Sequence, residues 1–157
     1  MTSQVDLERS RTITREGTVA QLSSLFRAEL AARETYDIAL GHSALSRYGD
    51  VLRRQKRVHG ERVAVLGARL HDLAVRPPES SGAWGTFARA VEDTGAAVST
   101  GMALAVLALE EETLANDYAA SLAVLDATSC NLVAERLLPA QNVTLLVIRR
   151  IHRQSAG

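Results

Sequence analysis

The sequence predicts an all-α protein in which two related helical hairpins form a four-helix bundle. Its 157 residues are rich in Ala, Leu, Val, Arg and Glu and contain only 4% aromatic residues, which favours helices over sheets. Apolar residues recur at alternating steps of three and four along four segments, as in helices that bury one face. One helix also occurs twice: Glu29 and Glu111 are each followed by a Tyr after seven residues and a Leu four residues beyond it.

The first hairpin is expected to follow a polar, flexible tail over residues 1–17, and the bundle itself to span residues 18–153. Thr18 with Gln21 resembles a capping box, which predicts a first helix over 18–42. Gly41 and Ser43 indicate a stop and a restart, with the second helix over 44–75. A loop this short makes the two helices antiparallel neighbours.

A long crossover is expected from Arg76 to Gly101, because Pro77 and Pro78 break the helical pattern. Within it, Trp84 to Asp93 has the spacing of a short helix lying along the outside of the bundle. A rival prediction is one unbroken helix from Trp84 to Leu125 that projects beyond the bundle and is covered by a second chain.

The second hairpin is expected to consist of helices over 102–125 and 130–152. Pro139 falls inside the fourth helix, where a proline removes one backbone hydrogen bond and usually kinks the chain.

Composition excludes several classes of protein. Lys plus Arg and Asp plus Glu number 18 each, so the formal net charge is zero and no basic surface indicates a nucleic-acid partner. The single cysteine, Cys130, excludes an internal disulfide and fits a reducing compartment. The first residues lack the apolar segment of a signal peptide, and the longest apolar run, Met102 to Leu109, is too short to span a bilayer. We therefore expect a cytoplasmic protein without a membrane partner.

The repeat places polar residues at matching depths inside the predicted bundle. The offset from Glu29 to Glu111 is 82 residues, and adding 82 to His59 gives Gln141. Twin carboxylates that project inward from two related helices are the skeleton of a metal-binding bundle. Glu29, His59, Glu111 and Gln141 fall at matching depths, and the family resemblance described next makes these four the candidate metal ligands.

The chain from about Val19 to His152 resembles bacterial ferritin-like four-helix domains of unknown function. The resemblance rests on a sparse set of residues, namely Glu29 with Tyr36, Arg57 to Arg62, Ser81-Gly82 through Gly85, Arg89, Glu111 with Tyr118, and Gln141. It implies a di-iron site in which two helices each supply a Glu-x-x-His motif. Here the positions three residues before His59 and Gln141 are Lys56 and Leu138, so both bridging carboxylates are missing.

Two functional hypotheses remain. In the first, the protein is a non-enzymatic, self-associating bundle without a cofactor, whose acids and histidine form a structural polar layer. Glu29 would then pair with Arg33 or His59, and Arg62 would pair with Glu111. Tyr36 and Tyr118 would donate hydrogen bonds from their hydroxyls to the two acids. In the second, a single iron, manganese or zinc ion binds Glu29, Glu111 and His59, and the protein takes part in metal or oxidative-stress handling.

Overall fold

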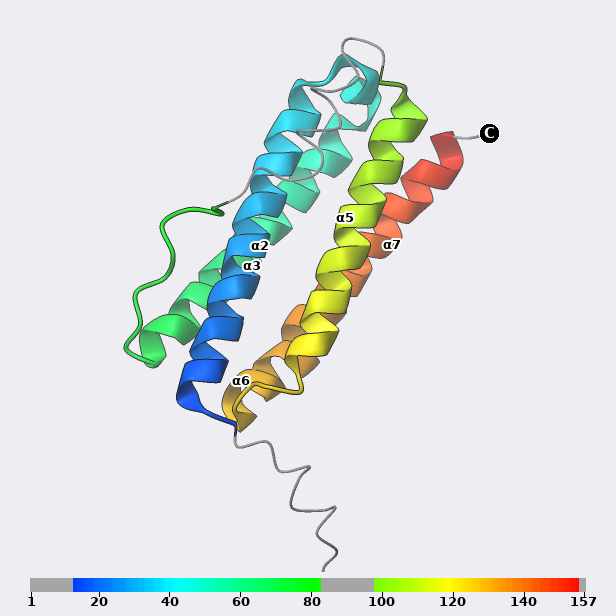
Figure 1. Cartoon of the computed structure of the whole chain (residues 1–157). Helices are drawn as coiled ribbons and strands as arrows, with labels where there is room; N and C mark the ends of the chain where they lie inside the picture. The colour runs from blue at the N-terminus through cyan, green and yellow to red at the C-terminus, as the bar shows by residue number, and fades with distance from the viewer. Residues whose placement is uncertain (1–12, 83–97, 156–157) are drawn as a thin grey trace, which may run out of the picture.

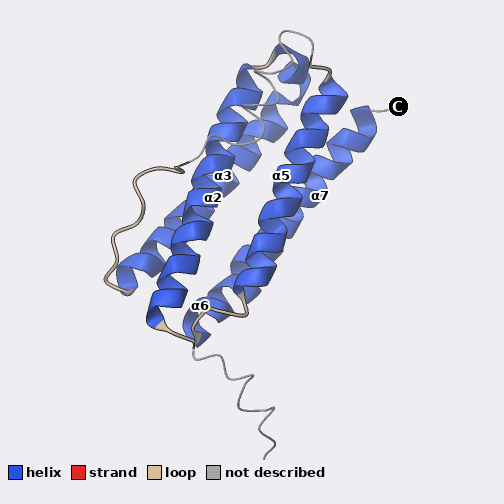
Figure 2. Ribbon diagram, viewed as in Figure 1, coloured by secondary structure: helices blue, strands red, loops and turns tan. Residues whose placement is uncertain are grey.

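The chain forms a bundle of four long helical segments in this computed structural model, which describes residues 13–82 and 98–155 (Figure 1). The first hairpin consists of α2 (Arg15–Gly41) and α3 (Gly49–Asp72), joined by the 3-10 turn η1 (Ser43–Tyr48). The second consists of α5 (Thr100–Ser121) and a fourth segment made of α6 (Ala127–Leu132), η3 (Val133–Leu137) and α7 (Leu138–Ser155). No strand occurs within the described ranges (Figure 2), so the all-α prediction is confirmed.

The third long helix starts at the far end of the bundle from the place where the second one ends. At one end, the Arg15 guanidinium donates to the carbonyl of Leu73, just after α3. At the other end, the hydroxyl of Thr100 donates to the carbonyl of Ala44, in the turn after α2, at 2.8 Å. The end of α3 and the start of α5 therefore lie at opposite ends of the bundle, as the crossover predicted from Arg76 to Gly101 requires. Residues 83–97 of that connection lie outside the described part of the chain.

The predicted start of the first helix is wrong by one turn. The N-cap is Thr14, whose side chain accepts a hydrogen bond from the Gly17 N–H at 2.9 Å, and the helix begins at Arg15 rather than at residue 18. Thr18 is fully buried, and its hydroxyl accepts the backbone N–H of Asp126 at 2.9 Å. The expected capping box with Gln21 does not form, because that hydroxyl makes a tertiary contact instead.

The other predicted bounds shift by a few residues. The second segment opens with the 3-10 turn over Ser43–Tyr48, and its α-helix ends at Asp72 rather than at residue 75. The third helix runs from Thr100 to Ser121 rather than over 102–125, and the fourth from Ala127 to Ser155 rather than over 130–152.

The rival prediction of one unbroken helix through Gly95 and Gly101 is wrong. Ser99 has extended backbone angles, φ −70° and ψ 155°, and its side chain caps α5 by accepting the Met102 N–H. The helix therefore begins anew after Ser99. The predicted short helix from Trp84 to Asp93 lies outside the described residues.

The helix before Pro139 contains one widened turn. In η3 the N–H of Leu138 reaches back five residues to the carbonyl of Val133, which is the π-helical pattern. Proline lacks the N–H for the normal bond to residue 135, and its ring would crowd that carbonyl in a regular α-helix. The irregularity that Pro139 predicted is therefore present, as a π turn on its N-terminal side.

The interior consists of two apolar clusters with a polar band between them. One cluster lies toward the end that contains η1 and includes Leu52, Leu104 and Ile148. The other lies toward the end that contains α6 and includes Leu22 and Leu66. Each long helix passes through both clusters and contributes polar side chains between them. No helix in the described ranges is long and apolar enough to cross a membrane.

Candidate functional site

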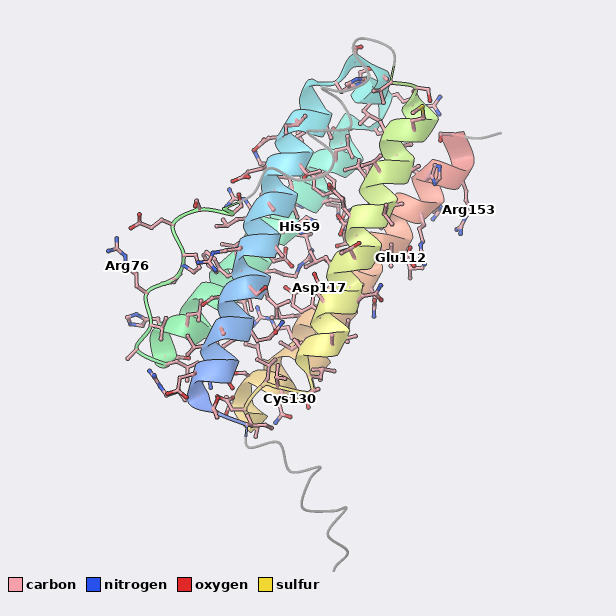
Figure 3. All side chains as sticks on the ribbon, viewed as in Figure 1. His59, Arg76, Glu112, Asp117, Cys130 and Arg153 are labelled. Atoms are coloured by element: carbon pink, nitrogen blue, oxygen red, sulfur yellow. The ribbon has the colours of Figure 1, made fainter. Side chains whose placement is uncertain are left out.

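A buried polar layer lies between the two apolar clusters, and each of the four long helices contributes to it. Glu29 comes from α2, His59 and Arg62 from α3, Glu111 from α5 and Gln141 from α7. None of these side chains is more than 4% exposed. Figure 3 shows side chains filling the space between the hairpins, with His59 about midway along the bundle. Each of these polar residues occupies an inward-facing position of its helix, where an apolar side chain is usual.

His59 bridges the two acids. Its Nδ1 lies 2.6 Å from Oε2 of Glu29, and its Nε2 lies 3.0 Å from Oε1 of Glu111. A neutral imidazole has one N–H and can donate to only one carboxylate, whereas the protonated ring donates to both. Hydrogen bonds from the ring to both carboxylates therefore require an imidazolium, which would join the two hairpins.

The electrostatics of the layer favour the same protonation state. Burial alone would lower the pKa of His59, but the charges and hydrogen bonds of Glu111 and Glu29 outweigh it and raise that pKa to about 8. Burial would likewise raise the pKa of Glu111, yet His59, Tyr36 and Gln141 together hold it below its usual value. The His59–Glu111 contact is thus an ion pair at neutral pH.

Arg62 brings a second positive charge into the layer. Its Nε donates to Oε1 of Glu29 at 2.7 Å, and its Nη2 donates to Oε1 of Gln141 at 2.7 Å. The same Nη2 lies 2.9 Å from Nδ1 of His59. Two carboxylates therefore face two cations, and the layer is charge-balanced.

Two tyrosines complete the coordination of the acids, each reaching across to the other hairpin. Tyr36 on α2 donates to Oε1 of Glu111, and Tyr118 on α5 donates to Oε1 of Glu29, both at 2.6 Å. Burial first, and then the neighbouring carboxylate, raise the pKa of each phenol well above its usual value. Both phenols therefore remain protonated donors.

Gln141 connects the fourth helix to the layer. Its Nε2 donates both to the backbone carbonyl of Glu111 at 3.0 Å and to Oε2 of the same residue at 2.6 Å. Its carbonyl oxygen accepts from Arg62, so both ends of the amide are satisfied. The amide orientation follows from these partners, since reversing it would place two donors together.

Several contacts between the two hairpins, in the layer and at the ends of the bundle, occur in pairs that follow the sequence repeat. The Tyr36–Glu111 and Tyr118–Glu29 bonds exchange partners under the offset of 82. The hydroxyls of Thr18 and Thr100, also 82 apart, contact the backbone at positions 126 and 44, which again differ by 82. The repeat inferred from sequence thus corresponds to equivalent contacts in the two hairpins.

The four predicted ligand positions, Glu29, His59, Glu111 and Gln141, do meet in one layer, and both tyrosines donate to acids as predicted. The predicted partner of Arg62 is wrong, because it pairs with Glu29 and not with Glu111. Glu29 takes His59 and Arg62 as partners, whereas Arg33 lies near the surface beside Gly60. In the described ranges, no group of three His, Cys, Asp or Glu residues is arranged to hold a metal ion.

One residue of the layer was missed by the sequence analysis. Thr144 is buried, and its hydroxyl oxygen lies 3.4 Å from Nη1 of Arg62. It is the residue 82 positions after Arg62, so the repeat itself could have identified it. The equivalent positions hold a charged side chain in one hairpin and a hydroxyl in the other.

A groove leads from the surface toward the layer at the seam between α2 and α5. Its volume is about 230 Å³. Small side chains of α2, Ala28, Ala32 and Thr35, line one side, and Val106 and Glu111 of α5 line the other. Glu111 is thus the member of the layer that lines this groove.

Comparison of the chain with protein-family models, with curated proteins and with solved structures finds no match.

Proposed function

We propose that this protein is a non-enzymatic, self-associating helical bundle of the ferritin-like type, in which the buried layer is structural. The observation that carries the proposal is that other side chains of the protein already donate hydrogen bonds to both carboxylates. Glu29 is engaged by His59, Arg62 and Tyr118, and Glu111 by His59, Tyr36 and Gln141, so each carboxylate has three donors from the protein.

The guanidinium of Arg62 is the strongest argument against a metal at this position. It lies against Glu29 and beside His59, where it supplies the positive charge that an ion would otherwise provide. A cation there would be repelled by Arg62 and would have to displace the imidazole from a carboxylate. The residues present therefore fit a metal ion poorly.

The positions that would complete a di-iron site support the same proposal. Lys56 ion-pairs with Asp37, where both side chains are partly exposed, and Leu138 packs against the apolar cluster near α6. Neither supplies a carboxylate to the layer. With two acids, one imidazole and one amide, the set is too poor in negative ligands for two iron ions.

A single-metal protein is the second candidate, and the groove that reaches Glu111 favours it by offering a route to the layer. Elemental analysis of protein purified without a tag or chelator separates the two. We expect iron, manganese and zinc each far below one atom per chain. A stoichiometric content of any of them would overturn the structural proposal.

A further inference from the structure

A groove lies on the seam between α3 of the first hairpin and α7 of the second. Its volume is about 340 Å³, and its walls are mostly aliphatic side chains: Val51, Val58, Ala140, Val143 and Val147. The polar residues that line it are Arg54, Gln55 and Thr144. We call it the α3–α7 groove. A concave site of this size, with apolar walls and a few polar groups, is typical of small-molecule binding sites.

Gln55 is the unusual residue of this groove, because its amide is buried without a hydrogen bond. The side chain is 4% exposed, and no other residue in the described part of the chain hydrogen bonds to it. Most buried polar side chains have a partner, since removing an amide from water without one is destabilising. Among the described residues, the one fully enclosed polar side-chain atom without a partner is Nδ1 of His42, so the amide of Gln55 still opens into the groove.

The sequence repeat indicates that the fold does not require an amide at this position. The residue 82 positions after Gln55 is Leu137, which is 1% exposed and packs in the apolar cluster near α6. The same inward position is therefore apolar in the second hairpin and polar in the first. A residue that breaks the packing rule without a structural gain is typical of a functional site.

The charge of the groove favours an anion. Arg54 lines it and forms no ion pair or hydrogen bond with another described residue, and none of the described lining residues is acidic. A second groove on the same seam, toward α6, provides a comparison. It is lined by Arg136, the residue equivalent to Arg54, but also by Asp72. Of these two grooves, the one beside Gln55 is the one that offers a cation with no acid against it.

We propose that the α3–α7 groove binds a small carboxylate with an aliphatic body, such as a medium-chain fatty acid. The valines contact the aliphatic chain, and the carboxylate accepts hydrogen bonds from Nε2 of Gln55 and from the guanidinium of Arg54. Hydrogen bonds to an ionised carboxylate are shorter and stronger than those between neutral groups. The ligand thus supplies the partner that the buried amide lacks within the protein. This site does not depend on self-association.

The test is isothermal titration calorimetry of the whole chain with octanoate. Octanol and octylamine keep the aliphatic chain and change the head group. Gln55→Leu introduces the residue found at position 137 and removes the amide, and Arg54→Gln removes the charge. The matched control is Arg136→Gln, at the equivalent position of the second hairpin. Thermal unfolding followed by circular dichroism verifies that each variant is folded.

We expect one octanoate to bind per chain, with an affinity about tenfold lower in Gln55→Leu and in Arg54→Gln, because each variant loses a hydrogen bond to a charged group. Arg136→Gln should bind as the wild type does, and octanol and octylamine should bind more weakly. Gln55→Leu should melt at the wild-type temperature or above, whereas a purely structural glutamine would lower it on replacement. Arg54 is exposed, so Arg54→Gln keeps the test decisive should Gln55→Leu unfold.

Three results would contradict the proposal. The site is wrong if octanoate shows no saturable binding to the wild-type chain, or if it binds either folded variant as tightly as the wild type. Octanol that binds as tightly as octanoate would overturn the assignment of a carboxylate.

Discussion

The hydroxyl of Tyr118 donates a 2.6 Å hydrogen bond to Glu29, which lies on the other hairpin. Because Tyr36 makes the reciprocal bond to Glu111, the two hairpins are linked crosswise at one depth. Each phenol is the neutral donor to a carboxylate that is otherwise held by charged or amide groups. The pair therefore joins the hairpins without altering the charge of the layer.

Replacing either tyrosine by phenylalanine is expected to destabilise the fold. Tyr118→Phe keeps the ring but removes one donor from buried Glu29, at a cost of about 1–3 kcal/mol in the free energy of unfolding. Tyr36→Phe should cost a similar amount, since its environment is equivalent. Urea unfolding measures both. Tyr48→Phe, at a half-buried tyrosine remote from the layer, is the control and should change stability little.

Neutralising one acid should cost more than removing one phenol. Glu29→Gln leaves the buried cations His59 and Arg62 with one carboxylate between them, and losing one partner of a buried ion pair costs about 3–5 kcal/mol. Glu111→Gln should act similarly, while Glu61→Gln on the surface should be nearly neutral. Thermal and chemical unfolding provide the measurement. The structural interpretation would be wrong should Glu29→Gln abolish a stoichiometric metal and leave the melting temperature unchanged.

Stability should fall as the pH rises through about 8. The pKa of His59 is raised from 6.5 to about 8 in the folded state, so folding is favoured by the protonated ring. Its contribution is complete below pH 6.5 and is lost as the pH rises through 8. The difference between the two values corresponds to about 2 kcal/mol. Four side chains surround the ring: Glu29 and Tyr36 from α2, Glu111 from α5, and Arg62 from the same helix as His59. The raised pKa of the Tyr36 phenol keeps it protonated throughout this pH range.

The variant His59→Gln isolates that effect, because Gln occupies the matching position 141 and carries no charge. We expect a lower stability at about pH 6 and a smaller decline between about pH 6.5 and 9 than in the wild type. Stability should also fall at acid pH, for a different reason. The pKa of Glu111 is lowered in the folded state, so the contribution of its carboxylate to the free energy of unfolding is lost as the pH falls below about 4.5. An alkaline decline that persists undiminished in His59→Gln would contradict the assignment to this ring.

The depth of the polar layer could be predicted from the sequence, but its pairing could not. Periodicity and the 82-residue offset place Glu29, His59, Glu111 and Gln141 together, because both follow directly from helical geometry. Arg62 pairs with Glu29, while Gln141 donates to Glu111. This pairing depends on side chain positions on three other helices and leaves no local signal in the sequence.

Local capping was equally ambiguous at the first helix. Thr14 and Thr18 are both reasonable N-caps, and Thr18 has the better motif because Gln21 follows it by three residues. The outcome was decided by the buried bond from the Asp126 N–H to Thr18, over a sequence separation of 108 residues. The π turn before Pro139 is similar: proline predicts a local irregularity, but its form depends on packing.

Ala74, just after α3, provides the last prediction. Its φ of 56° makes it the one non-glycine residue with a positive φ in the described ranges. The following N–H, of Val75, bonds back to the Leu70 carbonyl at 2.9 Å, and the Ala74 N–H bonds to His71 at 2.8 Å, which together end the helix as a Schellman motif. Glycine is the usual residue at this position, because a left-handed backbone costs other L-residues about 1–2 kcal/mol.

Ala74→Gly should therefore stabilise the protein. Relief of the left-handed strain is partly offset by the greater freedom of glycine in the unfolded chain, which costs about 0.5–1 kcal/mol. We expect a net gain of about 0.5–1 kcal/mol, measured by urea unfolding. Ala68→Gly, at an exposed position inside α3, is the matched control and should lose about 1 kcal/mol, because there the backbone is helical and only the entropic cost applies. Equal losses in the two variants would mean that the helix end does not hold Ala74 in the left-handed region in solution.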